Sequence, residues 1–82
     1  MAWDLATTIR DKIRSGALPL PPDRLGRCWV GTGTARPCDG CDTTITEDQM
    51  EYELDLADTR TLRFHDKCFT AWRAARAERL HE

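Results

Sequence analysis

Two pairs of residues have the types and the spacing that a metal ion requires. Cys38 and Cys41 form a Cys-x-x-Cys pair, and His65 and Cys68 form a His-x-x-Cys pair. A Cys-x-x-Cys turn directs both thiolates toward one point, and we expect Gly40 to relieve the strain of that turn. Structural zinc takes four nitrogen or sulfur ligands arranged as a tetrahedron. The sequence therefore predicts one closed Zn²⁺ site with these four residues as its ligands.

Other uses of the cysteines remain as alternatives. Cys28 replaces His65 as the fourth ligand if the site is built from cysteines alone. A redox pair at Cys38 and Cys41 is disfavoured, because such a pair opens a helix whereas residues 43–46 favour a strand. Structural disulfides need an oxidising compartment, for which the sequence carries no signal. The last alternative is that the chain keeps the fold of a zinc-binding domain but binds no metal.

The predicted ligand set argues against catalysis. A catalytic zinc keeps three protein ligands and an open water position, usually beside a carboxylate base. Three thiolates and one imidazole fill the four positions, and they leave the ion a poor Lewis acid. The chain is also short for a substrate pocket. We therefore expect no catalytic residues and no small-molecule substrate.

The segments around these pairs predict a hairpin and a helix. Apolar residues alternate with acidic ones over residues 50–56, which indicates a strand with one buried and one solvated face. A turn at residues 57–59 leads to a second strand with Leu62 and Phe64 inward and Arg63 outward, where it can pair with the acidic side chains. From residue 65 to residue 80 the pattern is helical. His65, Cys68, Phe69 and Trp72 fall on one face of that helix.

An amphipathic helix is predicted over residues 4–16. Asp4 has the character of an N-cap, and Gly16 stands where a left-handed C-terminal residue belongs. Its apolar face is formed by Leu5, Ile9 and Ile13. A helix of this length is marginal alone, so we expect it to dock on the core of its own chain. Residues 18–36 then form a connection that begins with prolines and contains a short strand near Cys28.

The order of knuckle, hairpin and helix start resembles the treble-clef zinc finger, and the ligand pairs resemble the first zinc site of LIM domains. The resemblance covers residues 37–80. The second LIM cluster, which would follow Cys68, is absent, so LIM partner specificity is not implied. The pattern as a whole also resembles short uncharacterised bacterial proteins. We expect a single α+β domain over residues 1–82, with the N-terminal helix docked on a zinc-stapled finger.

Composition limits the kinds of partner. The chain has 82 residues, with 14 acidic and 12 basic side chains and a net charge of −2, so it has no overall attraction for nucleic acid. It has no apolar run long enough to cross a membrane and no apolar leader, so we expect a cytoplasmic chain without a membrane partner.

The charged residues are unevenly distributed, and this bears on the binding surface. Residues 39–58 carry eight acidic and no basic side chains, and the last helix is basic. Internal pairing of the two is the expectation, as is closure of the core over the N-terminal helix by Trp3 and Trp29. The residues that remain as candidate partner contacts are Arg73, Arg76, Arg79 and Trp29. A protein partner is favoured, with self-association as one form of it, and nucleic-acid binding by the basic helix is the alternative.

Overall fold

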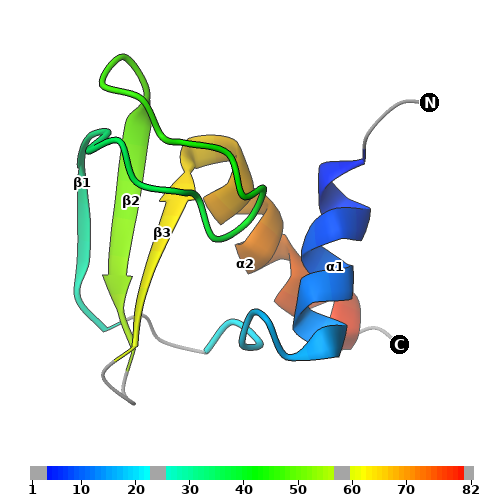
Figure 1. The fold of residues 1–82 in the computed structure, drawn as a ribbon. Helices are drawn as coiled ribbons and strands as arrows, with labels where there is room; N and C mark the ends of the chain where they lie inside the picture. Colours follow the sequence, from blue (N-terminus) through cyan, green and yellow to red (C-terminus); the bar gives the residue numbers. More distant parts are fainter. Residues whose placement is uncertain (1–3, 23–25, 57–59, 81–82) are drawn as a thin grey trace.

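The computed structural model describes residues 4–22, 26–56 and 60–80, with side chains described as far as residue 75. The elements follow in the order α1 (Leu5–Ser15), β1 (Cys28–Thr32), β2 (Met50–Asp55), β3 (Thr61–His65) and α2 (Asp66–Leu80). The strands form one antiparallel sheet in the order β1-β2-β3. α2 contacts β2 and β3 on one side and α1 on the other, so it lies between the sheet and α1 (Figure 1). The predicted α+β class is confirmed.

The N-terminal helix begins and ends where the sequence predicts. The Asp4 side chain caps α1 by accepting the Ala6 N–H at 3.1 Å. Gly16 ends the helix with a left-handed φ of 88°, which glycine adopts without strain, and its N–H reaches the Ile13 carbonyl. Ile9 is fully buried in the core. The predicted docking of this helix on its own chain is confirmed.

The sheet joins the predicted hairpin and the predicted short strand. In the β2–β3 hairpin, Glu53 lies opposite Arg63, and the two side chains form an ion pair at 2.9 Å. The expected pairing across the hairpin is therefore confirmed at this position. β1 pairs with the other edge of β2, with Val30 opposite Tyr52. The predicted turn at 57–59 lies outside the described residues.

The alternation predicted for β2 fails at its first two residues. Leu54, Leu62 and Phe64 are buried as expected, but Met50 is 51% exposed and Glu51 is 7% exposed. The Glu51 carboxylate accepts hydrogen bonds from the N–H and the hydroxyl of Thr34, at 3.3 and 2.8 Å. The loop after β1 therefore covers the face that the pattern assigns to solvent. A buried carboxylate is tolerated there because it has these donors.

Trp72 stands at the centre of the core. It is fully buried, its ring stacks on Phe64 at 5.2 Å between centroids, and its Nε1–H donates to the Pro19 carbonyl at 2.9 Å. The proline-containing connection is thereby held against α2. Trp29, which was expected to close the core, is 48% exposed, so that expectation is wrong for Trp29. Trp3 lies outside the described residues.

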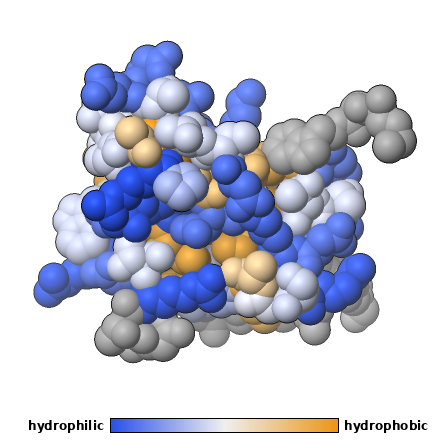
Figure 2. Space-filling view, viewed as in Figure 1, coloured by the Kyte–Doolittle hydropathy of each residue, from blue (hydrophilic) through white to orange (hydrophobic). Residues whose placement is uncertain are grey.

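The surface is mostly hydrophilic on the face shown in Figure 2, and hydrophobic atoms show mainly near the middle of that view, between the sheet and α1. Among the described segments, neither helix combines the length and the apolar character that a membrane span requires.

Candidate metal centre

The segment from Cys38 to Thr43 folds into a tight turn. The Asp42 N–H donates to the Cys38 carbonyl at 2.8 Å, and the Cys38 N–H donates to the Thr43 carbonyl at 2.9 Å. The chain reverses at Asp42, which has a left-handed φ of 68°. Aspartate is among the few residues that adopt this conformation at moderate cost. The turn brings the side chains of Cys38 and Cys41 to the same side, as the spacing predicts.

Gly40 has a different role from the one expected. Its φ is not left-handed, so it does not relieve strain in the turn. A Cβ atom at Gly40 would lie 2.8 Å from Cys68 Cβ and 3.0 Å from Ile9 Cδ1. The position is therefore filled by α1 and α2, which both pack against the backbone of the turn. Glycine is required here for space, and the left-handed residue is Asp42.

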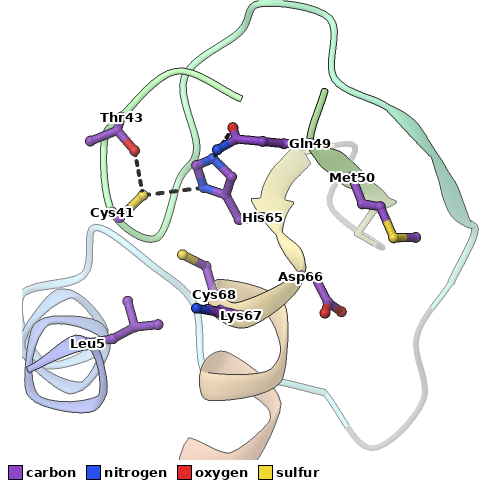
Figure 3. A pocket seen from close by; sticks show the side chains of 9 residues that line it. All are labelled: Leu5, Cys41, Thr43, Gln49, Met50, His65, Asp66, Lys67 and Cys68. Atoms are coloured by element: carbon purple, nitrogen blue, oxygen red, sulfur yellow. Dashed lines mark hydrogen bonds between the residues drawn. The ribbon is translucent and has the colours of Figure 1, made fainter. Parts of the chain in front are cut away.

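The second pair lies at a junction between a strand and a helix. His65 is the last residue of β3, and Cys68 lies in the first turn of α2, which starts at Asp66. The sequence placed both residues on a helix, and the correction is that β3 passes into α2 without a loop. The junction still directs both side chains toward the turn (Figure 3).

The four predicted ligands form one cluster. Their donor atoms all lie within 4.8 Å of one another. Cys38 and Cys68 are buried, and Cys41 and His65 are half-buried. A tetrahedral zinc ion with Zn–S bonds near ~2.3 Å holds its sulfur ligands ~3.8 Å apart, so the cluster requires only a small contraction. Three thiols and one imidazole are a donor set that suits this ion.

The alternative ligand Cys28 lies elsewhere. It is an exposed residue of β1, opposite Leu54 on β2, and the cluster does not include it. The cysteines of the described residues are all free thiols, so no disulfide joins them. The all-cysteine arrangement therefore has no counterpart in this geometry.

The Cys38 sulfur is surrounded by donors. It accepts the N–H of Gly40 at 3.3 Å and the N–H of His65 at 3.4 Å. A hydrogen bond from the Cys68 thiol, together with these backbone N–H groups, lowers the pKa of Cys38 well below that of an ordinary thiol. The same hydrogen bond raises the pKa of Cys68, because one proton is shared between the two sulfurs. The donors around the Cys38 sulfur thus favour its thiolate form.

Gln49 fixes the tautomer of His65. Its side-chain Oε1 accepts the N–H of Thr46 at 2.9 Å, which identifies this atom as the amide oxygen. The same oxygen lies 2.9 Å from His65 Nε2, so Nε2 must carry the proton and donate it. Nδ1 then has a free lone pair, and it lies 3.4 Å from Cys41 Sγ, inside the cluster. This is the tautomer that a metal-binding histidine needs.

Gln49→Ala is expected to weaken metal binding by about 10–100-fold, the usual effect of removing such an outer partner. Gln49→Glu keeps an acceptor oxygen for the Nε2–H and for the Thr46 N–H, so it is expected to retain most of the affinity. Competition with a chromophoric chelator measures both variants. Equal affinities for Gln49→Ala and the wild-type chain would show that Gln49 does not orient His65.

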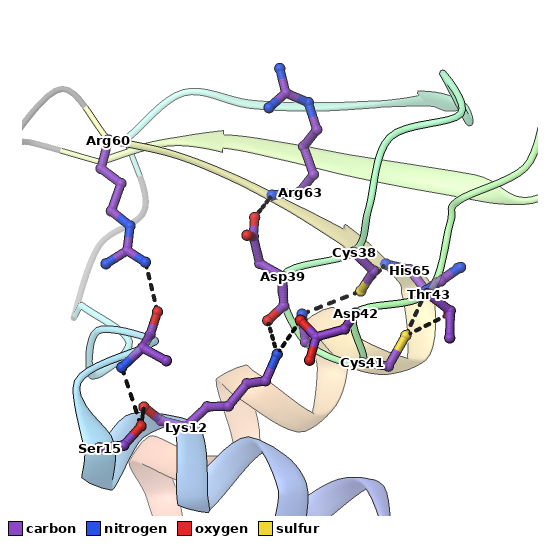
Figure 4. A network of polar contacts seen from close by, with 12 residues as sticks. Lys12, Ser15, Cys38, Asp39, Cys41, Asp42, Thr43, Arg60, Arg63 and His65 are labelled. Atoms are coloured by element: carbon purple, nitrogen blue, oxygen red, sulfur yellow. Dashed lines mark hydrogen bonds and ion pairs between the residues drawn. The ribbon is translucent and has the colours of Figure 1, made fainter.

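Lys12 of α1 holds the turn from the other side. Its Nζ donates to the Asp39 carbonyl at 3.0 Å and pairs with Asp42 Oδ1 at 2.6 Å (Figure 4). The Asp39 carboxylate accepts the N–H of Arg63 at 2.7 Å, so the turn is also fixed to β3. Sequence reasoning missed Lys12, because nothing local marks a lysine of α1 as the partner of an aspartate 30 residues away.

Of the predicted partner contacts, the structure describes the side chains of Arg73 and Trp29. Arg73 lies over the Phe69 ring at 5.9 Å, a cation–π contact on α2. The predicted pairing of this basic helix with the acidic block is thus replaced at Arg73 by an aromatic contact. The side chains of Arg76 and Arg79 lie outside the described residues. Trp29 is half-exposed on β1.

A pocket of about 500 Å³ opens beside the cluster. Figure 3 shows Leu5 of α1 on one side of it and Cys41, His65 and Cys68 on the other. The cluster therefore lies at the surface of a shallow depression between α1, the turn and the start of α2.

No protein-family description, curated protein sequence or solved structure matches the chain.

Proposed function

We propose that the chain is a small zinc-binding module in which one Zn²⁺ ion is held by Cys38, Cys41, His65 and Cys68. The observation that carries the proposal is the convergence of these four donor atoms within 4.8 Å. Two of them come from the turn and two from the β3–α2 junction. The arrangement of His65, with Nε2 bound to Gln49 and Nδ1 facing Cys41, supports it as the fourth ligand.

The proposed role of the ion is structural. Four protein ligands complete a tetrahedron and leave no position for water or substrate. The ion would cross-link the turn to the junction, and these are the two segments on which α1 packs through Ile9. A core as small as this one gains a large part of its stability from such a cross-link. We expect no enzymatic activity from this centre.

The proposed function of the whole module is to present a surface to a protein partner. Trp29, Val30 and Met50 are each about half exposed, with Trp29 on one face of the sheet and Val30 and Met50 on the other. Tryptophan is enriched among the side chains that anchor protein contact surfaces, so Trp29 is the residue that supports this part of the proposal most. A net charge of −2 and the pairing of Arg63 with Glu53 speak against a nucleic-acid surface. Nucleic-acid binding by the basic α2 is the competing function.

Native mass spectrometry tests the first part of this proposal. We expect one zinc ion per chain. The mass should increase by that of zinc less the mass of at least two protons, since the cysteines bind as thiolates and release their protons. A chain that is purified without metal and folds equally well in EDTA contradicts it.

Capture of partners from cell extract at low and high salt, with and without nuclease, tests the second part. Protein partners that resist nuclease support it. Recovery that depends on nucleic acid and falls steeply as salt rises favours the competing function.

A further inference from the structure

The outer edge of β1 differs from the other edge of the sheet. On β3, the N–H and carbonyl of Arg63 bond to the carboxylate and N–H of Asp39, at 2.7 and 2.8 Å, so the turn covers that edge. On the opposite side β1 is the last strand, and all five of its residues are exposed. Figure 1 shows β1 on the side of the sheet away from both helices. Among the described residues, no strand pairs with its outer edge.

The hydrogen bonds at both ends of β1 show which groups face outward. The Gly33 N–H donates to the Gln49 carbonyl, and the Asp55 N–H donates to the Arg27 carbonyl. In an antiparallel pair such bonds recur at every second residue. Residues 27, 29, 31 and 33 therefore bond to β2, and the N–H and carbonyl groups of Cys28, Val30 and Thr32 point away from it.

The side chains of β1 do nothing to protect this edge. Edge strands usually carry a charged residue, a proline or a bulge that prevents pairing with another chain. β1 has the sequence Cys-Trp-Val-Gly-Thr, with neither a charge nor a proline, and its register with β2 is regular over all five residues. Trp29 and Val30 are 48% and 50% exposed.

We propose that a second copy of this chain pairs with β1, edge to edge and antiparallel, around a two-fold axis at Val30. This register places Val30 opposite the partner's Val30 and Cys28 opposite the partner's Thr32. Every outward N–H and carbonyl of β1 is then used, in three hydrogen-bonded residue pairs. A shift by two residues in either direction keeps only two such pairs. The two sheets join into one continuous sheet of six strands.

Gly31 supports this register. A Cβ atom at Gly31 would meet nothing within 4 Å, so packing in a single copy does not require glycine in the middle of this strand. Glycine inside a strand weakens it and often marks a close approach by another chain. Around Val30, Trp29 lies opposite the partner's Gly31. The missing side chain leaves room for the indole ring to lie across the partner strand, on both sides of the axis.

The absence of charge on β1 also favours a second copy. Both copies carry the same net charge, so self-association needs a contact region without like charges. The β1 edge is such a contact region without like charges.

This inference rests on the proposed function only in naming a protein as the partner, and it does not depend on the metal.

Sedimentation of the full-length zinc-loaded chain over a range of concentrations tests the proposal. We expect a reversible monomer–dimer equilibrium. Val30→Pro removes an outward N–H from each copy and leaves the bonds to β2 intact, because proline is tolerated at a sheet edge. It is expected to weaken dimerisation by about tenfold or more, since two hydrogen bonds at the axis are lost. Val30→Thr keeps the N–H and the shape, and is the matched control.

The register is tested separately by the formation of a new disulfide cross-link between the two copies. Hydrogen-bonded antiparallel pairs have Cα atoms about 5.5 Å apart, which suits a disulfide. With glutathione disulfide as the oxidant, Thr32→Cys is expected to yield dimers joined between Cys28 and position 32 of the partner. The wild-type chain is expected to yield none, because Cys28 faces threonine.

A chain that remains monomeric throughout, or a dimer indifferent to Val30→Pro, overturns the proposal. So does a link between the two Cys28 thiols, because it requires another register. Zinc stoichiometry measured on the same samples keeps this outcome separate from failure of the metal site.

Discussion

The Cys38→Ser chain is expected to lose its metal ion and most of its stability. Cys38 is 1% exposed, and its sulfur accepts the N–H groups of Gly40 and His65. Serine offers a hydroxyl that zinc binds poorly. Structural zinc in small fingers contributes ~10–16 kcal/mol of binding free energy at neutral pH, which is as large as the ~5–15 kcal/mol that separates most folded domains from their unfolded chains. We therefore expect the variant to be largely unfolded.

Far-UV circular dichroism and metal analysis of the purified variant measure this effect. Cys28→Ser is the matched control, because Cys28 is an exposed cysteine outside the cluster. It should keep one zinc ion and the wild-type melting midpoint. If Cys28→Ser releases zinc and His65→Ala does not, the ligand set is the all-cysteine one.

Trp72→Ala is expected to lower the free energy of unfolding by ~3–5 kcal/mol, the usual cost of removing a buried large aromatic side chain. Trp72 is fully buried and stacks on Phe64. Its removal also leaves the Pro19 carbonyl without the indole donor. The connection between α1 and β1 therefore loses one hydrogen bond to α2 in the same step.

Urea unfolding of the zinc-loaded chain measures the change. Trp29→Ala removes the same side chain from a position that is 48% exposed, so it should cost far less. The comparison is made at concentrations low enough for the chain to be a monomer. Equal losses for the two variants would show that burial of Trp72 is not what stabilises the core.

The parts of the structure that could be predicted from sequence are those governed by local spacing. The caps of α1 depend on Asp4 and Gly16 themselves, and the two ligand pairs each lie within one turn of chain. The proximity of the two pairs was predictable because the hairpin between them brings the end of the second strand back beside the start of the first. The edge pairing of β1 with β2 was not predicted, because it joins segments about 20 residues apart without a turn signal.

The failures share one physical cause, which is packing between distant segments. Glu51 is buried because Thr34 lies over it, and no pattern within β2 contains that information. Gly40 is explained by the close approach of Ile9 and Cys68. Trp29 and Trp72 are the same residue type, and their opposite burial depends only on which elements cover them.

The position of α1 bears on how a metal ion would enter and leave the proposed centre. α1 packs on the turn through Ile9 at Gly40 and through Lys12 at Asp39 and Asp42, and Leu5 lies beside the cluster. Its contacts are with segments far along the chain, whereas the hairpin holds itself together locally. We expect local opening of such a helix to require less free energy than unfolding of the whole molecule. Detachment of α1 from the rest of the chain would expose the turn and Cys68 to a competing chelator or a metal donor. We therefore expect zinc transfer to become faster when α1 is destabilised, although this helix supplies none of the ligands.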